Sequence, residues 1–349
     1  MANPWITVIV PAYNAMTTIE GCLRSLLQQT QPLDTYEIVV VVDGPDDGTE
    51  EQARRYGAHV LVQPHRGPAA ARNAGAACAR GDVLLFLDAD CEPKEDWIEQ
   101  MVRPFQDPGI VGVKGVFKTR QRSLVARFAQ AEYEEKEDQM CRGQYIDFID
   151  TGSAGYRADV FRENGGFSTD LPGAEDVEFS FRLAARGYKM VLAKQAVVYH
   201  RHPKSLTEYL GRKFRYGIWR SFVYHRLPSK IVRDSRTPWA MKVQIGLTFL
   251  LIITCLISVL RPFLVTGAVA ILGLFVLSTF PFCLRVARKD PAVAILSPIM
   301  LLLRAITSLA GLAVGVGWVC LLLCYEGFHR SIAWARHLRS RGKDEAFHS

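Results

Sequence analysis

Two aspartates, Asp88 and Asp90, are the residues whose type and spacing most directly indicate chemistry. The apolar run before them, residues 83–87, is too short for a core helix and predicts a buried strand. If the strand stays extended through Asp90, both side chains emerge on one face, because side chains alternate along a strand. Two neighbouring carboxylates repel each other unless a positive charge lies between them. The pattern therefore predicts a site for a hard divalent cation that substrate phosphates also bind.

Other apolar runs are expected to form the sheet that positions this pair. Strands are predicted at residues 5–10, 37–42 and 59–62, with helices between them at about 15–29, 49–56 and 69–79. Strands that are almost purely apolar and alternate with helices indicate a parallel sheet covered on both faces. Such sheets bind ligands beyond the carboxyl ends of their strands. We therefore expect five side chains to meet in one crevice: Tyr13, Asn14, Asp43, Asp88 and Asp90.

Five short motifs occur in an order that resembles family 2 glycosyltransferases: Pro11-Ala12-Tyr13-Asn14, Asp43-Gly44, Ala71-Arg72-Asn73-x-Gly75, Asp88-x-Asp90 and Glu175-Asp176. The resemblance covers about residues 5–217. It implies an α/β, Rossmann-like GT-A domain with a mostly parallel sheet, and the inverting transfer of a sugar from a nucleoside-diphosphate sugar. It also implies the residues that bind this donor: Pro11, Tyr13, Asn14, Asp43, Arg72, Asp88 and Asp90. Taken alone, Asp43 is also typical of a turn, and Arg72 of a solvated helix.

Asp176 is the predicted catalytic base. A sugar hydroxyl is a poor nucleophile while it is protonated, so the transfer needs a carboxylate to accept its proton. The resemblance assigns this role to the Asp of Glu175-Asp176. The alternative is that both acids only stabilise the start of a helix. Small residues at 151–157 resemble the acceptor-side loop of the family, and the residues expected on the acceptor and diphosphate side are Gly152, Ser153, Glu175, Arg212, Arg215 and Tyr216.

A divalent metal, Mn²⁺ or Mg²⁺, is the expected cofactor, because it would stabilise the charge on the departing nucleoside diphosphate as a Lewis acid. Asp90 is the predicted ligand, and some related enzymes imply a second ligand, His200, after the apolar run 196–199. His200 is alternatively the start of a basic surface segment. The acidic stretch at residues 132–138 is expected to be the solvated face of a helix. The eight cysteines include no Cys-x-x-Cys pair, so no zinc site is predicted.

The balance of charge changes abruptly along the chain. Residues 1–200 hold 21 Lys and Arg against 29 Asp and Glu, whereas residues 201–349 hold 21 against 6. Such an asymmetry indicates nucleic acid or an anionic surface as a partner. Three apolar stretches, 239–260, 262–283 and 292–324, favour the membrane over nucleic acid, because each is long enough to span a bilayer. The basic residues between 201 and 242 are then expected to lie against anionic lipid headgroups.

These observations divide the chain into four expected parts. The first is a catalytic domain at residues 1–200, with a nucleotide-sugar half at about 1–115 and an acceptor half at about 116–200. A basic amphipathic juxtamembrane segment at 201–238, transmembrane helices at 239–328 and a basic tail at 329–349 follow.

The orientation in an inner or plasma membrane is also predicted. No signal peptide precedes Trp5, so the catalytic domain is expected in the cytoplasm, and the basic loop 284–290 is expected on the same side. The first two spans then form a hairpin turning near Arg261 and Pro262. The third apolar region is too long for one untilted span, and Pro298 and Arg304 are the points at which it would divide.

The sequence as a whole predicts a membrane-anchored, metal-dependent glycosyltransferase that acts on a lipid-linked or polysaccharide acceptor at the cytoplasmic face of the membrane. One alternative is a processive polysaccharide synthase. Tyr216 argues against it, because the motif that Arg212 to Tyr216 resembles ends in Trp in such synthases. An alternative from another class is a sugar nucleotidyltransferase, which would release pyrophosphate instead of a nucleoside diphosphate. A membrane scaffold that binds the donor without turnover is a further alternative.

Overall fold

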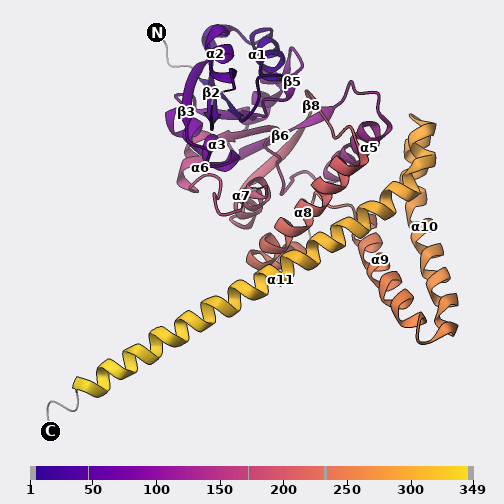
Figure 1. Ribbon diagram of the computed structural model, residues 1–349. Helices are drawn as coiled ribbons and strands as arrows, with labels where there is room; N and C mark the ends of the chain where they lie inside the picture. Colours follow the sequence, from indigo (N-terminus) through magenta and orange to yellow (C-terminus); the bar gives the residue numbers. More distant parts are fainter. Residues whose placement is uncertain (1–4, 46, 172, 232–233, 345–349) are drawn as a thin grey trace.

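The chain folds into a sheet domain followed by long helices, as the computed structural model in Figure 1 shows. The structure describes the backbone of residues 5–344 except 46, 172 and 232–233, and the side chains up to residue 323. One sheet of eight strands forms the centre of the domain, in the order β3-β2-β1-β4-β7-β6-β8-β5. Helices cover both of its faces (Figure 1).

The first half of the sheet is parallel, as the sequence predicts. Its strands are β1 (Ile6–Ala12), β2 (Tyr36–Asp43), β3 (His59–Gln63) and β4 (Val83–Leu87), and they alternate with α1 (Ile19–Leu27), α2 (Thr49–Arg55) and α3 (Pro68–Cys78). Alternate side chains of β1 pack on opposite faces, Val8 with the core under α1 and Ile9 with the core under α3. Burial on both faces explains why β1, β2 and β4 are almost purely apolar. Strand β4 ends at Leu87, so a turn and not an extended strand carries Asp88 and Asp90.

The second half of the sheet mixes directions. Strand β7 is antiparallel to β4 and β6, β8 is parallel to β6, and β5 is antiparallel to β8. Residues 153–157 therefore form a buried strand, and the expectation of a loop over the whole stretch 151–157 is wrong. The elements of this half are β5 (Cys91–Pro93), α4 (Trp97–Val102), β6 (Ile110–Lys118), α5 (Leu124–Met140), β7 (Ser153–Arg157), α6 (Ala158–Glu163), α7 (Glu175–Ala185) and β8 (Lys189–His200).

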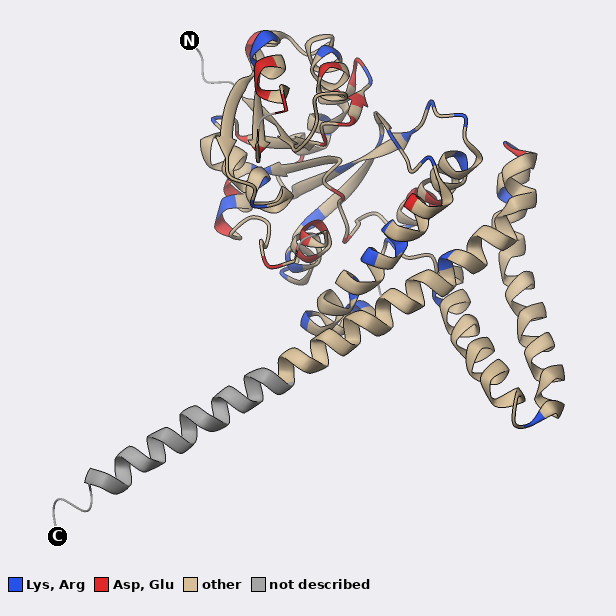
Figure 2. Cartoon of the chain, in the orientation of Figure 1, with Lys and Arg blue, Asp and Glu red and all other residues tan. Residues whose placement is uncertain are grey.

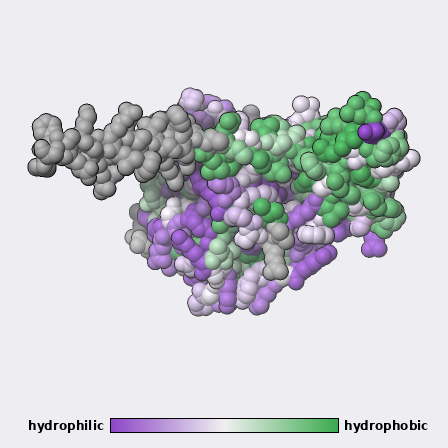
Figure 3. All heavy atoms as spheres, turned by 90° about the horizontal axis from the view of Figure 1, so that it is seen from below, coloured by the Kyte–Doolittle hydropathy of each residue, from purple (hydrophilic) through white to green (hydrophobic). Residues whose placement is uncertain are grey.

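Four long helices follow the sheet domain: α8 (Leu206–Arg226), α9 (Trp239–Ser258), α10 (Val265–Ala287) and α11 (Pro291–Asp344). Three segments are long and apolar enough to cross a membrane, Trp239–Ser258, Pro262–Ala287 and Pro291–Leu323. Helices α9 and α10 form the predicted hairpin, and α11 runs unbroken through Pro298 and Arg304, so the structure does not divide it there. Charged residues concentrate on the sheet domain and α8 (Figure 2), and hydrophobic surface concentrates over the apolar helices (Figure 3).

Helix α8 crosses α11 at a contact made by glycines. A Cβ atom added to Gly311 would lie 2.2 Å from the carbonyl oxygen of Phe214, and one added to Gly217 would lie 2.6 Å from that of Ser308. The two backbones therefore touch, which only residues without a side chain allow at these positions. This crossing connects the juxtamembrane helix rigidly to an apolar helix.

The stretch 132–138 is not the solvated helix face expected from its charges. Glu132 is 1% exposed and accepts hydrogen bonds from Tyr209, Lys213 and Arg304, at 2.9, 2.8 and 2.8 Å. The reason is that α8 and α11, far along the sequence, cover this side of α5. Arg304 in the third apolar region thus finds its partner in the sheet domain.

Candidate functional site

A cavity of about 360 Å³ lies between the sheet domain and the helices α8, α9 and α11. Nine of the predicted site residues line it: Arg72, Asp88, Asp90, Gly152, Glu175, Asp176, His200, Arg212 and Tyr216. They come from the first half of α3, the turn after β4, the residue before β7, the start of α7, the end of β8 and the middle of α8. Residues as far apart in the sequence as Arg72 and Tyr216 therefore meet at one place, as ligand sites at the strand ends of such sheets do.

Arg72 connects the two acidic motifs of the cavity. Its guanidinium donates from Nη2 to Asp88 Oδ1 and from Nη1 to Glu175 Oε1, both at 2.7 Å. Its side chain is only 5% exposed. Charge-assisted bonds from one buried guanidinium fix the positions of both carboxylates. Arg72 thus connects the acidic turn after β4 to the first turn of α7, which carries Asp176.

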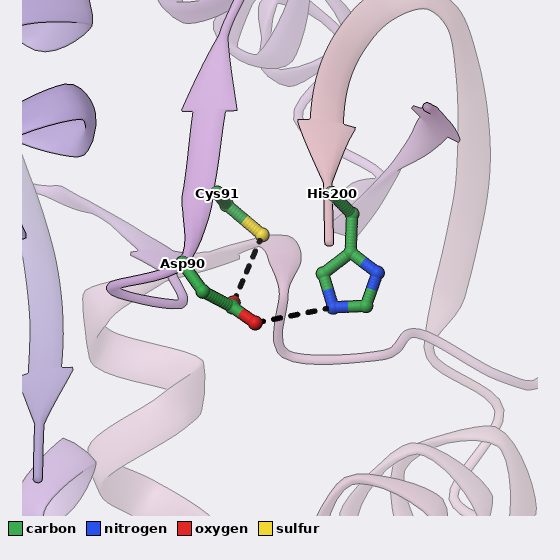
Figure 4. A group of neighbouring side chains, drawn as sticks. All are labelled: Asp90, Cys91 and His200. Carbon is green, nitrogen blue, oxygen red and sulfur yellow. Dashed lines mark hydrogen bonds and ion pairs between the residues drawn. The ribbon is translucent and has the colours of Figure 1, made fainter. Parts of the chain in front are cut away.

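Asp90 and His200 approach each other at the edge where β5 pairs with β8. Figure 4 shows the carboxylate of Asp90 facing the imidazole ring, with 3.7 Å between Asp90 Oδ2 and His200 Nε2. Cys91 lies beside them, with its Sγ 3.7 Å from Asp90 Oδ1. Burial raises the pKa of the Cys91 thiol well above its usual value, which keeps the sulfur protonated. The carboxylate oxygen and the imidazole nitrogen are donors that suit Mn²⁺, so this pair fits the predicted metal.

A chain of hydrogen bonds behind His200 sets which ring nitrogen faces Asp90. Gln130 donates to the carbonyl of Phe117, which leaves its Oε1 to accept from His202 Nε2 at 2.9 Å. His202 Nδ1 is then an acceptor, and it lies 3.2 Å from Nδ1 of His200, which donates. The Nε2 atom is the ring nitrogen of His200 that faces Asp90. Such second-layer bonds are typical behind metal-binding histidines.

Asp176 lies in the first turn of α7 and lines the same cavity. Its Oδ1 accepts from the backbone N–H of Val177 at 2.7 Å. Burial, together with the nearby carboxylates of Glu175 and Asp150, raises the pKa of Asp176 to about 7. A carboxylate with this pKa can accept a proton at neutral pH and is a better base than an exposed aspartate.

Four other predicted donor residues, Pro11, Tyr13, Asn14 and Asp43, are not among the residues that line the cavity, which holds only Asp88 and Asp90 of the five side chains expected in one crevice. Asp43 is buried and accepts from the backbone N–H groups of Arg66 and Gly67, at 2.8 and 2.9 Å. His65 lies 3.0 Å from Asp43 and packs on Tyr13, with ring centroids 4.4 Å apart. Asn14 follows with φ of 50°, and Pro11 pairs with β2 inside β1. These residues form a separate group at the ends of β1 and β2.

The residues predicted on the acceptor side also differ in whether they lie on the cavity. A Cβ atom on Gly152 would lie 3.2 Å from Asp88 Oδ2, so the glycine lets the backbone come close to the acidic turn. Ser153 is fully buried, and its hydroxyl accepts from Trp97 Nε1 at 2.9 Å, which directs it into the core and not toward an acceptor. Arg215 is exposed on α8 and lies outside the lining of the cavity.

Several lining residues have no counterpart among the predictions. The charged ones among them are Lys136, Asp150, Lys213, Arg220, Arg236 and Lys242. Lys136 belongs to the acidic stretch that was expected to be solvated, and Arg236 to the segment expected to lie on lipid headgroups. Neither belongs to a local motif, so only tertiary packing reveals their position.

Comparisons with known proteins identify relatives of the chain. The family described as glycosyl transferase family 2 matches residues 7–165. Glycosyltransferase AglE of Haloferax volcanii is 30% identical over 226 residues, which cover 61% of this chain and 72% of that protein. The pre-mycofactocin glycosyltransferase of Mycobacterium tuberculosis is 30% identical over 223 residues, which cover 61% of this chain and 46% of that protein.

A solved structure shares the fold. The mannosyltransferase PcManGT from Pyrobaculum calidifontis, solved in complex with GDP-Man and Mn²⁺, superposes with a TM-score of 0.55 at 23% identity, and the match covers 88% of both chains. This likeness confirms the GT-A-type architecture of the sheet domain. With the length and identity of the match to AglE, the comparisons show that the chain belongs to glycosyltransferase family 2.

Proposed function

We propose that the protein is a membrane-anchored, metal-dependent inverting glycosyltransferase that moves a sugar from a nucleoside-diphosphate sugar to a lipid-linked acceptor. Family membership supports the transfer reaction and its activated donor. The observation that carries the rest is the course of the cavity, which starts at Asp90 and Asp176 and continues to Met241, Ile245 and Leu312 on the apolar helices. An acceptor that carries a lipid would find its reactive group and its apolar chain accommodated in one space.

Three of the lining residues have chemical roles in this proposal. Asp90 and His200 would hold Mn²⁺ or Mg²⁺, which when bound stabilises the negative charge on the departing diphosphate. Asp176 accepts the proton of the acceptor hydroxyl while the new bond to the anomeric carbon forms. The bond from that carbon to the diphosphate breaks, and its electron pair leaves with the nucleoside diphosphate. A single displacement of this kind inverts the anomeric centre.

The proposed cytoplasmic orientation is supported by contacts between the sheet domain and the loop that joins α10 to α11. Lys289 contacts Glu134 of α5 at 2.8 Å, and Asp290 accepts two hydrogen bonds from Arg127 at 2.7 Å each. The basic loop and the sheet domain therefore lie at the same end of the apolar helices. Basic loops favour the cytoplasmic side of a membrane.

The proposal is tested with the full chain purified in detergent. UDP- and GDP-sugars are screened with Mn²⁺ and a polyprenyl-phosphate-linked acceptor, and the release of nucleoside diphosphate is measured. Asp176→Asn should lower the rate by about 10²- to 10⁴-fold, the usual contribution of a general base. Asp159→Asn, at an exposed acid in the first turn of α6, is the matched control and should keep the rate. Release of pyrophosphate, or folded protein that binds no donor, would overturn the proposal.

A further inference from the structure

Two basic residues of the cavity lack an acidic partner. Five of its cations form ion pairs with described carboxylates: Arg72, Arg212, Lys213, Arg220 and Lys242. Lys136 and Arg236 also line the cavity, but neither forms an ion pair or a hydrogen bond with another residue that the structure describes. Lys136 lies over the ring of Tyr133, with 5.3 Å from Nζ to the centroid. Arg236 lies over Phe148 at 4.1 Å.

The surroundings of Lys136 favour an anion. Burial and the positive charges of Lys213, Arg236 and Arg304 hold its pKa well below the usual value, and Glu132 acts in the other direction. Glu132 already accepts hydrogen bonds from two of these cations. A partly buried cluster with excess positive charge is unfavourable unless an anionic group joins it. Described carboxylates lie near the two cations, Glu132 and Glu135 by Lys136 and Asp150 and Asp176 by Arg236, but none of them forms an ion pair or a hydrogen bond with either cation.

The two unpaired cations lie toward the acceptor end of the cavity. The charged groups that act most strongly on Asp90 are His200, Asp88 and Arg212, so Arg212 is the cation nearest the metal pair. Arg236 instead faces Asp176 and Asp150, and Lys136 faces Arg236 and Lys213. The donor diphosphate belongs with the metal pair, so the unpaired cations face the part of the cavity that remains for the acceptor.

Beyond these cations the lining becomes apolar. Side chains from α8, α9 and α11 form this part: Trp219, Val223, Met241, Ile245 and Leu312. The lining of the cavity thus combines an acidic end with His200, a base, a cationic pair and apolar side chains from three helices. A ligand that matches this lining carries a reactive group, an anionic group and a long apolar chain.

We propose that Lys136 and Arg236 together bind the phosphate group of the acceptor, with the apolar chain of the same molecule lying against α9 and α11. This inference rests on the proposed function and adds the chemical class of the acceptor, a phosphate ester of a lipid alcohol. The planar guanidinium of Arg236 can bind two phosphate oxygens at once, and the ammonium of Lys136 supplies a point charge beside it. The phosphate in turn restores the positive charge of Lys136.

The test compares Lys136→Gln and Arg236→Gln with Lys194→Gln, which changes an exposed lysine of β8 outside the cavity. Binding of a fluorescent polyprenyl phosphate to the full chain in nanodiscs is measured first, and then the KM for acceptor and for donor. Loss of one charged hydrogen-bonding group should weaken lipid phosphate binding and raise the acceptor KM by about 10- to 150-fold. The donor KM and the Lys194→Gln variant should remain at wild-type values.

Further measurements separate the possible failures. Polyprenol without phosphate should bind weakly to the wild type, and a soluble sugar phosphate should compete weakly, because it lacks the chain. Equal competition by the sugar phosphate would show that the phosphate alone is recognised. It would overturn the proposal that the apolar chain of the acceptor binds against α9 and α11. A donor KM that rises as much as the acceptor KM would assign the pair to the donor and overturn the inference. If lipid phosphate binds through both residues but no sugar is transferred, the proposed function fails while this site stands.

Discussion

Glu132 joins the sheet domain to the apolar helices, and replacing it should destabilise the protein more than replacing its partner Arg304. Glu132→Gln leaves Lys213 and Arg304 buried without their shared carboxylate, and breaking a buried charge pair costs about 3–5 kcal/mol. Arg304→Met is milder, because Glu132 keeps Lys213 and Tyr209. It loses the hydrogen bonds from Arg304 to Glu132 and to the side-chain oxygen of Gln244, but it leaves no buried charge without a counter-ion.

The assay is thermal unfolding of the detergent-solubilised full chain at neutral pH. At about 2–4 °C per kcal/mol for a domain of roughly 200 residues, Glu132→Gln should lower the Tm by about 6–20 °C. Arg24→Met removes an exposed pair between neighbouring turns of α1 and serves as the control, with an expected cost of about 0.5 kcal/mol or less. The reasoning is refuted if Arg304→Met is at least as destabilising as Glu132→Gln, or if neither exceeds the control.

Three further predictions concern the reaction and the helix crossing. Because the pKa of Asp176 is raised to about 7, and its ionised form is the base, kcat/KM should fall about tenfold per pH unit below pH 7 and level off above it. A chelator should stop nucleoside diphosphate release, and His200→Ala should weaken Mn²⁺ binding in calorimetry even where donor is absent. Gly311→Ala inserts a methyl group between touching backbones and should cost about 1–3 kcal/mol in thermal unfolding. Gly317→Ala, whose added methyl group meets nothing within 4 Å, should leave stability unchanged or raise it by up to about 1 kcal/mol; equal effects of the two would contradict the described contact.

The first half of the sheet was predictable because its signal is local. Strands β1, β2 and β4 are short apolar runs buried on both faces, β3 is a short run at the edge of the sheet, and each is separated from the next by a helix. The small residues of β7 give no such signal. Gly155 lies where a Cβ atom would be 2.9 Å from Leu85, so the strand is specified by its close approach to β4 and not by its own propensity. The strand β4 that specifies β7 in this way lies about 70 residues earlier in the sequence.

The residues of the site also divide into those that a local motif predicts and those that only tertiary packing reveals. Asp88, Asp90 and Asp176 belong to compact motifs, and the structure places all three on the cavity. Lys136 stands among four acids in the sequence, which is typical of a solvated helix, and it reaches the cavity only because α8 packs across α5. The interaction of Glu132 with Arg304 spans 172 residues and two parts of the fold. The charge pattern of one helix does not indicate which other elements will pack against that helix.

The glycine contact between α8 and α11 has a practical consequence. Helix α8 carries Arg212 and Tyr216 on the wall of the cavity, and the apolar helix that touches it contributes Ser308 and Leu312 to the same wall. A shortened protein that stops before Trp239 would keep every sequence motif yet lose this wall and expose the glycine face of α8. The protein thus does not separate into a soluble catalyst and a detachable anchor, and inhibitor screens on a truncated form would sample a different binding surface.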